Sequence, residues 1–520
     1  MRRFLSHGAD RCPNGRWLPA SLDIVAGKRI VAARRFGRID FWEAQIATET
    51  HHVIVIGSGA GGAAAAYRLA KAGKRVLVVE KGPFLPRDAS TLDVREVFVN
   101  GAFKNHDAWS DGHGHAFTPS EFYNVGGKTK WYGAALFRFR PEEFEAEPNF
   151  SLLGWPFGYE ELAPFYDEAS ALLEITTFAN EPELQSIIDR IVAADSRWKP
   201  ESLPLGLSKA ILSSPEEAKH FDGFASPSGY KSDAERNLID RVLDLPNFTL
   251  IAGDPVIRLI AASDDPNRIV GVECVSGARH EADRIVLAAG AMTSPRILQD
   301  YLRANGLRLP CDQLIGGNFK MHINSAIMGF SPFADHDVLR KTAVFFNERY
   351  PHSSMQCLGW MDGDMLAALE PSHLPQFLDR FFGRRAIGFW ATTEDGSSPE
   401  NRIISGGSGE PPTLDYRLDR IIQSQREHEA MVEDWRLRLL EAGLIGFDKY
   451  TGIATTSHAL GSMVMGADPT ASVVDAHGKV HGLEGLYVGD GSPLPRSSRV
   501  NPSLTIYAWG LRLGQHLAAA

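Results

Sequence analysis

The sequence predicts an α/β protein with a Rossmann-like dinucleotide-binding domain, and three observations predict it. Residues 53–56 (VIVI) form a short apolar run that is typical of a buried strand. The motif Gly57-x-Gly59-x-x-Gly62 follows at once and leads into a helix-forming stretch over residues 63–72. A second apolar run, residues 75–79, ends on Glu80. Strand, glycine-rich turn, helix, strand and acid in this order form the unit that grips a dinucleotide.

Each residue of this motif has its own task. Gly57 permits the tight turn, Gly59 lets the backbone approach a pyrophosphate, and Gly62 lets the helix pack close to the strand. The helix N-terminus presents free N–H groups and a positive dipole end to the phosphates. Glu80 is placed to accept hydrogen bonds from a ribose diol.

The composition is that of a large soluble enzyme. The chain has 520 residues, 44% of them hydrophobic and 23% charged, which suits two domains around sizeable cores. Its net charge of −10 argues against a nucleic-acid surface. The four cysteines are widely spaced without a CxxC, so we expect neither a disulfide framework nor a zinc site. No apolar run is long enough to span a membrane and no signal peptide is evident, so we expect a cytoplasmic protein.

Two segments outside the motif carry weaker signals. Residues 1–50 predict an N-terminal arm of unknown role, with a short helix over 41–47. Residues 101–120 are polar and glycine-rich and hold His106, His113 and His115. With the nearby aspartates these histidines could bind a metal, but none is anchored on a regular element. We therefore expect a solvent-exposed or lid loop there and no metal site.

Further strands follow in the middle of the chain. Residues 247–291 are expected to form short strands, with DDPN (264–267) as a turn between two of them. The last of these strands, 284–288, should lead through Gly290 into a helix that starts near Thr293, Ser294 and Pro295. The interval 318–450 is rich in aromatic residues, which serve as core or as the walls of a pocket.

The last 65 residues carry the second strong signal. A strand over 486–488 ends at Gly489-Asp490-Gly491-Ser492, and Asn501-Pro502 precedes a helix from Ser503. An Asp-Gly pair at a strand end beside a helix start is a plausible second contact to a cofactor.

Taken with the N-terminal motif, this tail resembles the glucose–methanol–choline (GMC) family of FAD oxidoreductases. The resemblance extends over most of the chain and includes these segments: 125–127, 155–166 (WPFGYEELAPFY), 290–298, 316–322 and 399–402. The stretch 155–166 and the tail are most similar to the branch that holds pyranose oxidases, gluconate and glucose dehydrogenase flavoprotein subunits, and glycoside 3-oxidases.

The resemblance implies a fold and a domain division. The fold is an α/β, GMC-type FAD-binding domain of the p-hydroxybenzoate-hydroxylase-like class, with a second α+β substrate domain built on an antiparallel sheet. Residues 51–150, 226–317 and 456–520 would form the FAD-binding domain. Residues 151–225 and 318–455 would form the substrate-binding domain.

The resemblance also implies roles for single residues. The residues expected to hold FAD are Gly57, Ser58, Gly59, Gly62, Glu80, Gly126, Gly127, Lys128, Thr129, Val256, Asp490, Gly491, Asn501 and Pro502. The catalytic pair would be His458, from the family's HxxG motif, and Asn501.

Two positions depart from the family pattern. Several relatives attach FAD covalently through a histidine four residues after the Gly-Gly pair, where this chain has Trp131. Others carry asparagine at the next position, where this chain has Tyr132. We therefore expect FAD to be bound without a covalent link. At the second active-site position many relatives carry histidine, and this chain has Asn501.

The expected reaction is oxidation of an alcohol group on a sugar, glycoside or polyol. FAD would take a hydride, His458 would accept the hydroxyl proton, and Asn501 would hold the same oxygen. Each has a plainer interpretation as well: a hydrogen-bonded histidine at a strand–loop junction, and an Asn-Pro turn. His322 is interpreted as a structural residue near the cofactor.

Two other functions remain open from the sequence. One is a non-redox GMC lyase such as a hydroxynitrile lyase, and the other is the flavoprotein subunit of an electron-transfer dehydrogenase complex. The expected partners are a small alcohol substrate and O₂ or another electron acceptor, with assembly into a homo-oligomer left open.

Overall fold

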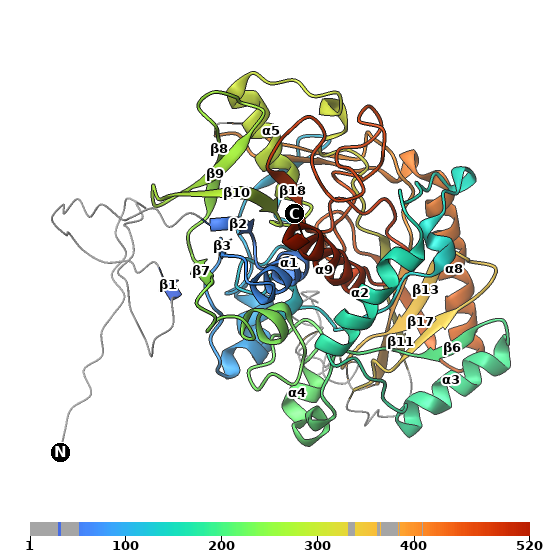
Figure 1. Cartoon of the computed structure of the whole chain (residues 1–520). Coiled ribbons are helices and arrows are strands. Elements are labelled where there is room, and N and C mark those ends of the chain that lie inside the picture. Colours follow the sequence, from blue (N-terminus) through green and yellow to red (C-terminus); the bar gives the residue numbers. More distant parts are fainter. Residues whose placement is uncertain are drawn as a thin grey trace, which may run out of the picture.

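Two large β-sheets organise the chain, and helices pack against each of them (Figure 1). The computed structural model describes residues 30–32, 51–330, 339–360, 365, 383, 385–407 and 409–519. The predicted helix over 41–47 lies outside these residues.

The first sheet is mainly parallel and contains the dinucleotide unit. Its strands in the described residues follow the order β1-β7-β3-β2-β10-β9-β8, and β18 pairs with β10. Among these described strands, β9 runs antiparallel to both of its neighbours, β8 and β10, and the other pairs are parallel. The strands are β1 (Ile30–Ala32), β2 (His51–Ile56), β3 (Val76–Glu80), β7 (Phe248–Ala252), β8 (Val256–Ala261), β9 (Ile269–Cys274), β10 (Arg279–Leu287) and β18 (Leu486–Val488). Strands β2 and β3 are apolar and buried on both faces at their centres, as parallel strands require.

Two helices from opposite ends of the chain pack together beside this sheet. Helix α1 (Ala60–Lys71) follows the glycine motif, and α9 (Ser503–Ala519) packs along it. A Cβ added at Gly510 would lie 2.3 Å from the carbonyl oxygen of Gly61, so glycine is what allows the two backbones to approach. Helix α2 (Tyr159–Leu172) packs on the other side of α9, and α5 (Ser294–Asn305) packs near β8.

The second sheet is antiparallel throughout. In the described residues its order is β17-β11-β14-β13-β12-β6. Helix α8 (Ile422–Glu441) covers it, with α3 (Pro182–Ala194) beside α8 (Figure 1). The core between them includes Trp198, Phe345, Phe389 and Trp435. The strands are β6 (Lys199–Ser202), β11 (Ile323–Phe330), β12 (Ala343–Phe346), β13 (Ser353–Cys357), β14 (Ala386–Thr393) and β17 (Ile445–Tyr450). The predicted combination of a Rossmann-like sheet and an antiparallel sheet is confirmed.

A small third sheet joins distant parts of the chain. It contains β15 (Arg402–Ile404), β16 (Thr413–Asp415), β4 (Trp109–Asp111) and β5 (Ala116–Phe117). The stretch predicted as a lid or solvent loop is therefore partly a β-hairpin, because β4 pairs with both β5 and β16. Within the described residues, no three histidine, cysteine or acidic side chains gather as metal ligands. One short helix, α4 (Pro215–Lys219), follows β6 and precedes β7 in the sequence.

Most predicted elements are found close to their predicted bounds. The turn over 264–267 joins β8 to β9, α5 begins at Ser294, and α9 begins at Ser503. The prediction was wrong for the start of α1, which begins at Ala60 and not at residue 63. Glycine occupies positions 61 and 62 of this helix because close contacts with neighbouring backbone leave no room for a side chain. None of the described helices is long and apolar enough to cross a lipid bilayer.

Candidate functional site

A cavity of about 710 Å³ opens between the two large sheets. Its volume lies within the range of small-molecule and cofactor sites, about 300–1,000 Å³. The predicted site residues that line it are Gly57, Ser58, Gly59, Glu80, Gly127, Lys128, Thr129, Val256, His458, Asp490, Gly491, Asn501 and Pro502. Gly62 and Gly126 are not among its lining residues. The structure thus brings together residues from both ends of the chain.

The glycine motif forms one wall of the cavity at the N-terminus of α1. Gly57 has φ +102°, a left-handed conformation, and a Cβ there would meet the carbonyl oxygen of Ala288 at 2.4 Å. Gly62 packs inward, since its Cβ would lie 2.2 Å from the carbonyl oxygen of Gly57. At Gly59 nothing lies within 4 Å of a Cβ position, so the cavity reaches the backbone there. This leaves room for a pyrophosphate against the helix N-terminus.

Glu80 braces this loop from the end of β3. One carboxylate oxygen accepts hydrogen bonds from the backbone N–H and the hydroxyl of Ser58, at 2.9 and 2.7 Å. The other accepts from the N–H of Gly82 at 2.9 Å. Burial raises the pKa of Glu80, and these hydrogen bonds oppose the rise. A carboxylate has about four acceptor positions, so acceptor capacity remains on the cavity side.

The second glycine turn, residues 126–129, lies across from the first. Gly126 has φ +86°, and its N–H donates to the Ser58 hydroxyl at 3.0 Å. The hydroxyl of Thr129 donates back to the carbonyl of Gly126 at 2.6 Å. Lys128 forms an ion pair with Glu121 at 2.5 Å, so its charge is balanced within the wall of the cavity.

Asp490 ties three elements together where the parallel strands end. Its carboxylate accepts hydrogen bonds from the N–H groups of Gly290 and Ser492, both at 2.8 Å, and from the hydroxyl of Ser294. Burial raises its pKa, and these hydrogen bonds oppose the rise. The carboxyl ends of parallel strands are where α/β sheets bind their ligands.

The far end of the cavity holds His458 and Asn501 side by side. The amide nitrogen Nδ2 of Asn501 lies 3.2 Å from Nε2 of His458. Nε2 of Gln356, on β13, donates to Oδ1 of Asn501 at 2.6 Å. Burial, to which His322 and Lys341 add, holds the pKa of His458 well below its ordinary value. The imidazole is therefore neutral near pH 7 and able to accept a proton.

Comparisons with known proteins agree with this geometry. Residues 52–314 match the family described as FAD dependent oxidoreductase, and residues 420–510 match the family described as GMC oxidoreductase. The chain is an FAD dependent oxidoreductase whose C-terminal part matches the GMC oxidoreductase family. The first match covers the glycine motif and most strands of the first sheet.

Among its relatives is the paromamine 6'-oxidase of Streptomyces fradiae, 27% identical, with 92% of this chain and 93% of the relative aligned. The 2-methyl-1,2-propanediol dehydrogenase of Mycolicibacterium austroafricanum is 23% identical, with 90% and 95% aligned. Among solved structures, pyridoxine 4-oxidase from Mesorbium loti has a TM-score of 0.69 and 18% identity, covering 90% of this chain and 99% of that one. This last likeness is one of fold.

Trp131 and Tyr132, the two positions where the sequence departs from the family pattern, form an aromatic part of the cavity wall. Trp131 is buried, donates its indole N–H to Oδ1 of Asn124 at 2.9 Å, and stacks on Phe122 with ring centroids 4.8 Å apart. The hydroxyl of Tyr132 donates to the carbonyl of Ser232 at 2.7 Å. Both side chains have fixed partners, and the indole of Trp131 has no nucleophilic nitrogen to offer a flavin.

Sequence reasoning missed the polar residues that the second sheet adds to the cavity. Lys341 pairs with Asp222 at 2.6 Å, and both line the cavity near His458. A Cβ at Gly133 would meet both side chains at 2.2 and 2.4 Å, so this glycine makes room for the pair. Trp360 and Trp390 line the same region. No local motif marks these residues, because segments far apart in the sequence bring them to the cavity.

Proposed function

We propose that this oxidoreductase converts a hydroxyl group of a sugar, glycoside or polyol to a carbonyl. The observation that carries the proposal is the pair His458–Asn501. A neutral histidine lies beside an amide at the end of a cavity whose other end is the glycine motif. In this proposal the substrate hydroxyl replaces Asn501 as the partner of Nε2 of His458, and Asn501 turns its N–H to the substrate oxygen.

Each side chain has one task in the proposed reaction. His458 accepts the hydroxyl proton through Nε2, and its lowered pKa keeps it free to do so at neutral pH. Asn501 donates a hydrogen bond to the same oxygen, and Gln356 holds the amide in place. Bound FAD supplies the acceptor for the hydride that leaves the carbon.

The surroundings of this pair suit a polyhydroxylated substrate. The Lys341–Asp222 pair offers N–H donors and carboxylate acceptors, which match neighbouring hydroxyl groups. The indoles of Trp360 and Trp390 add large apolar faces to the same region. The relative named as a paromamine 6'-oxidase makes aminoglycosides the first sugars to test.

We also propose that FAD is held without a covalent bond by the lining residues named above, with Glu80 near the ribose and residues 57–59 and 126–129 near the pyrophosphate. The support is the open backbone at Gly59 and the buried indole at position 131. We also propose the domain division given above, and its support is that the strands of the two large sheets, apart from β1, come from the two sets of segments.

An anaerobic spectroscopic screen tests the function. Paromamine, simple sugars, glycosides, linear polyols and aromatic alcohols are each mixed with the yellow holoenzyme, and loss of flavin absorbance is followed. Bleaching by a sugar or polyol, but not by aromatic alcohols, supports the proposal. Admitting air afterwards separates an oxidase from a dehydrogenase. Cleavage of a cyanohydrin with no bleaching by any alcohol would favour the lyase instead.

A further inference from the structure

A second histidine stands directly behind His458. The ring of His322 is buried, with 1% of its surface exposed, and its Nδ1 lies 2.8 Å from Nδ1 of His458. Its other nitrogen, Nε2, lies 2.8 Å from the carbonyl oxygen of Ser498 and 3.1 Å from that of Ser497. The two rings meet nearly at right angles, at 86°. His322 therefore connects His458 to the backbone of the loop that leads to Asn501.

The two carbonyls decide which way the hydrogen bonds run. A carbonyl oxygen can only accept, so Nε2 of His322 carries a hydrogen and donates it. The ring nitrogens of His322 contact two carbonyl oxygens and another imidazole, and the arrangement proposed below has this ring in its neutral form. A neutral ring with a hydrogen on Nε2 has a bare Nδ1, which must accept.

This assignment also fixes the direction of the two hydrogen bonds that His458 makes. The Nδ1 of His458 must donate to the bare Nδ1 of His322, so Nε2 of the neutral His458 carries no hydrogen. That bare Nε2 accepts from Nδ2 of Asn501, whose Oδ1 in turn accepts from Gln356. Amide groups alone leave this order undecided, since each can be turned over. The backbone carbonyls of Ser497 and Ser498 are the only members of the chain of contacts whose role is fixed by chemistry.

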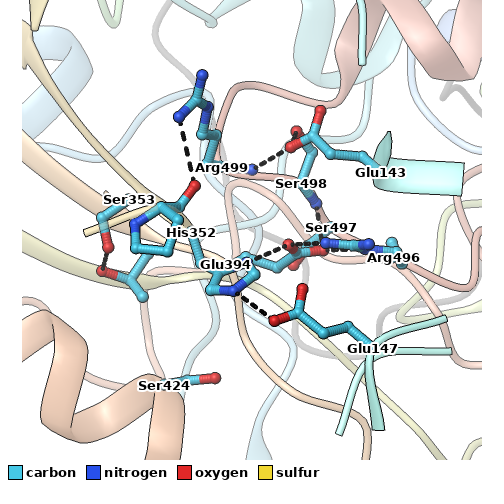
Figure 2. Close-up of polar contacts among 12 residues, drawn as sticks. Glu143, Glu147, His352, Ser353, Glu394, Ser424, Arg496, Ser497, Ser498 and Arg499 are labelled. Atoms are coloured by element: carbon cyan, nitrogen blue, oxygen red, sulfur yellow. Dashed lines mark hydrogen bonds and ion pairs between the residues drawn. The ribbon is translucent and has the colours of Figure 1, made fainter. Parts of the chain in front are cut away.

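Buried carboxylates hold these carbonyls in place. Ser498 has φ +66°, a left-handed conformation that side chains other than glycine adopt rarely, and this conformation lets two successive carbonyls converge on one N–H. The N–H of Ser498 donates to Glu394 at 2.9 Å, and its hydroxyl donates to Glu143 at 2.6 Å. Figure 2 shows Ser498 between these two glutamates. Arg496 forms two hydrogen bonds with the fully buried Glu394, at 2.9 and 2.7 Å, and so anchors the start of the loop.

We propose that His322 is a positioning residue, set by the carbonyls of Ser497 and Ser498, that fixes the ring of His458 with Nε2 as its proton acceptor. The inference rests on the proposed function of His458. It also explains how the protonated ring is stabilised during the reaction. After His458 takes the hydroxyl proton on Nε2, its Nδ1–H still donates to His322, so this contact needs no rearrangement.

The positions of the ring hydrogens can be measured without any substrate. In FAD-loaded enzyme labelled with ¹⁵N-histidine, the imidazole nitrogen shifts separate protonated from unprotonated nitrogens, and His322→Asn and His458→Ala assign the two rings. We expect a hydrogen on Nε2 of His322 and on Nδ1 of His458. A hydrogen on Nε2 of His458 near pH 7 would overturn the proposal.

Two variants of His322 test its effect on the reaction, with paromamine as the alcohol and anaerobic flavin reduction as the assay. Asparagine places Oδ1 where the imidazole has Nδ1 and can still accept from His458, whereas leucine cannot. We expect His322→Leu to reduce the rate about tenfold or more, the cost of a buried donor without its partner, and His322→Asn to restore most of that loss. Equal rates for the two variants would contradict the positioning role.

Ser498 offers a matched pair that isolates the conformation of the loop. Alanine and glycine both remove the hydroxyl bonded to Glu143, but only glycine adopts the left-handed conformation without penalty. The ¹⁵N shifts should show that Ser498→Ala disturbs the hydrogen positions on the rings of His322 and His458 more than Ser498→Gly does. Identical spectra for the two would refute the role of the loop. If His458→Ala keeps the wild-type rate, the proposed function fails, while the nitrogen shifts still decide the order of the hydrogens.

Discussion

Removing the side chain of Asn501 separates positioning from proton transfer. In the structure its amide joins two partners, His458 at 3.2 Å and Gln356 at 2.6 Å, and it lines the cavity. The amide has no acid–base role near pH 7, so Asn501→Ala removes a hydrogen bond to the substrate oxygen and leaves the base in place. Asn501→His returns a donor at the same position.

The expected magnitudes are far enough apart to measure. A neutral hydrogen bond contributes about 0.5–1.5 kcal/mol, which corresponds to about 2- to 13-fold in rate. Loss of a group that accepts a proton in the transition state costs on the order of 10²–10⁴-fold. We therefore expect substrate to reduce the flavin of His458→Ala at least about tenfold more slowly than the flavin of Asn501→Ala. Asn501→His should keep partial activity.

The measurement is anaerobic stopped-flow reduction at saturating substrate, with the FAD content of each variant determined first. Wild-type FAD content in both alanine variants is the control that keeps folding and cofactor loss out of the comparison. If Asn501→Ala were reduced as slowly as His458→Ala, the amide would share in moving the proton and the assignment of roles would be wrong. A His458→Ala variant with the wild-type rate would remove that histidine from the mechanism.

Three further predictions concern the cofactor, the pH and the packing. Acid precipitation should release all the yellow colour, because Trp131 stands where relatives carry the linking histidine; colour kept in the pellet would show a covalent bond. Burial alone would lower the pKa of His352, but the contact with Glu394 outweighs burial, and the pKa is raised. A raised pKa in the folded state stabilises the fold only while the ring is protonated. Urea unfolding should therefore show that His352→Gln loses more stability at about pH 6 than at about pH 9, and an equal loss at both would contradict this. Gly510→Ala should lower the melting temperature and FAD retention, at a cost of about 1–3 kcal/mol, whereas Gly158→Ala, where nothing lies within 4 Å of the Cβ position, should leave both near wild type.

The parts of the fold that the sequence predicts well are those set by local chemistry. Residues 53–80 carry strand, turn and helix signals in one continuous stretch, and β2, α1 and β3 are found there. The turn over 264–267 and the Pro295 helix start depend on a few neighbouring residues in the same way. The start of α1 was missed because Gly61 and Gly62 are poor helix formers by local propensity, and the need for glycine at position 61 comes from the close backbone of Gly489, far away in the sequence.

The residues of the candidate site also fall into two groups, those in a recognisable sequence pattern and those brought in by distant contacts. His458 and Asn501 belong to a tail whose pattern resembles a family, so their neighbourhood could be expected before the structure was seen. Gln356 and Lys341 come from strands and loops of the antiparallel sheet that have no motif of their own. The contact between His322 and His458 depends on a left-handed backbone at His322, φ +64°, which no residue pattern in the sequence indicates.

The packing of α9 on α1 has a consequence for the order of events during synthesis. The glycine motif is made early and α9 late; Arg68 on α1 and Gln515 on α9, which are hydrogen-bonded, stand 447 positions apart. Synthesis proceeds at about 5–20 residues per second. The face of α1 that packs on α9 therefore stays uncovered for tens of seconds after α1 is made. Asp490, Asn501 and Pro502 also reach the cavity only at this late stage. Cofactor capture is therefore expected to follow the synthesis of α9, and the supply of FAD at that moment would govern how much of the newly made chain becomes enzyme.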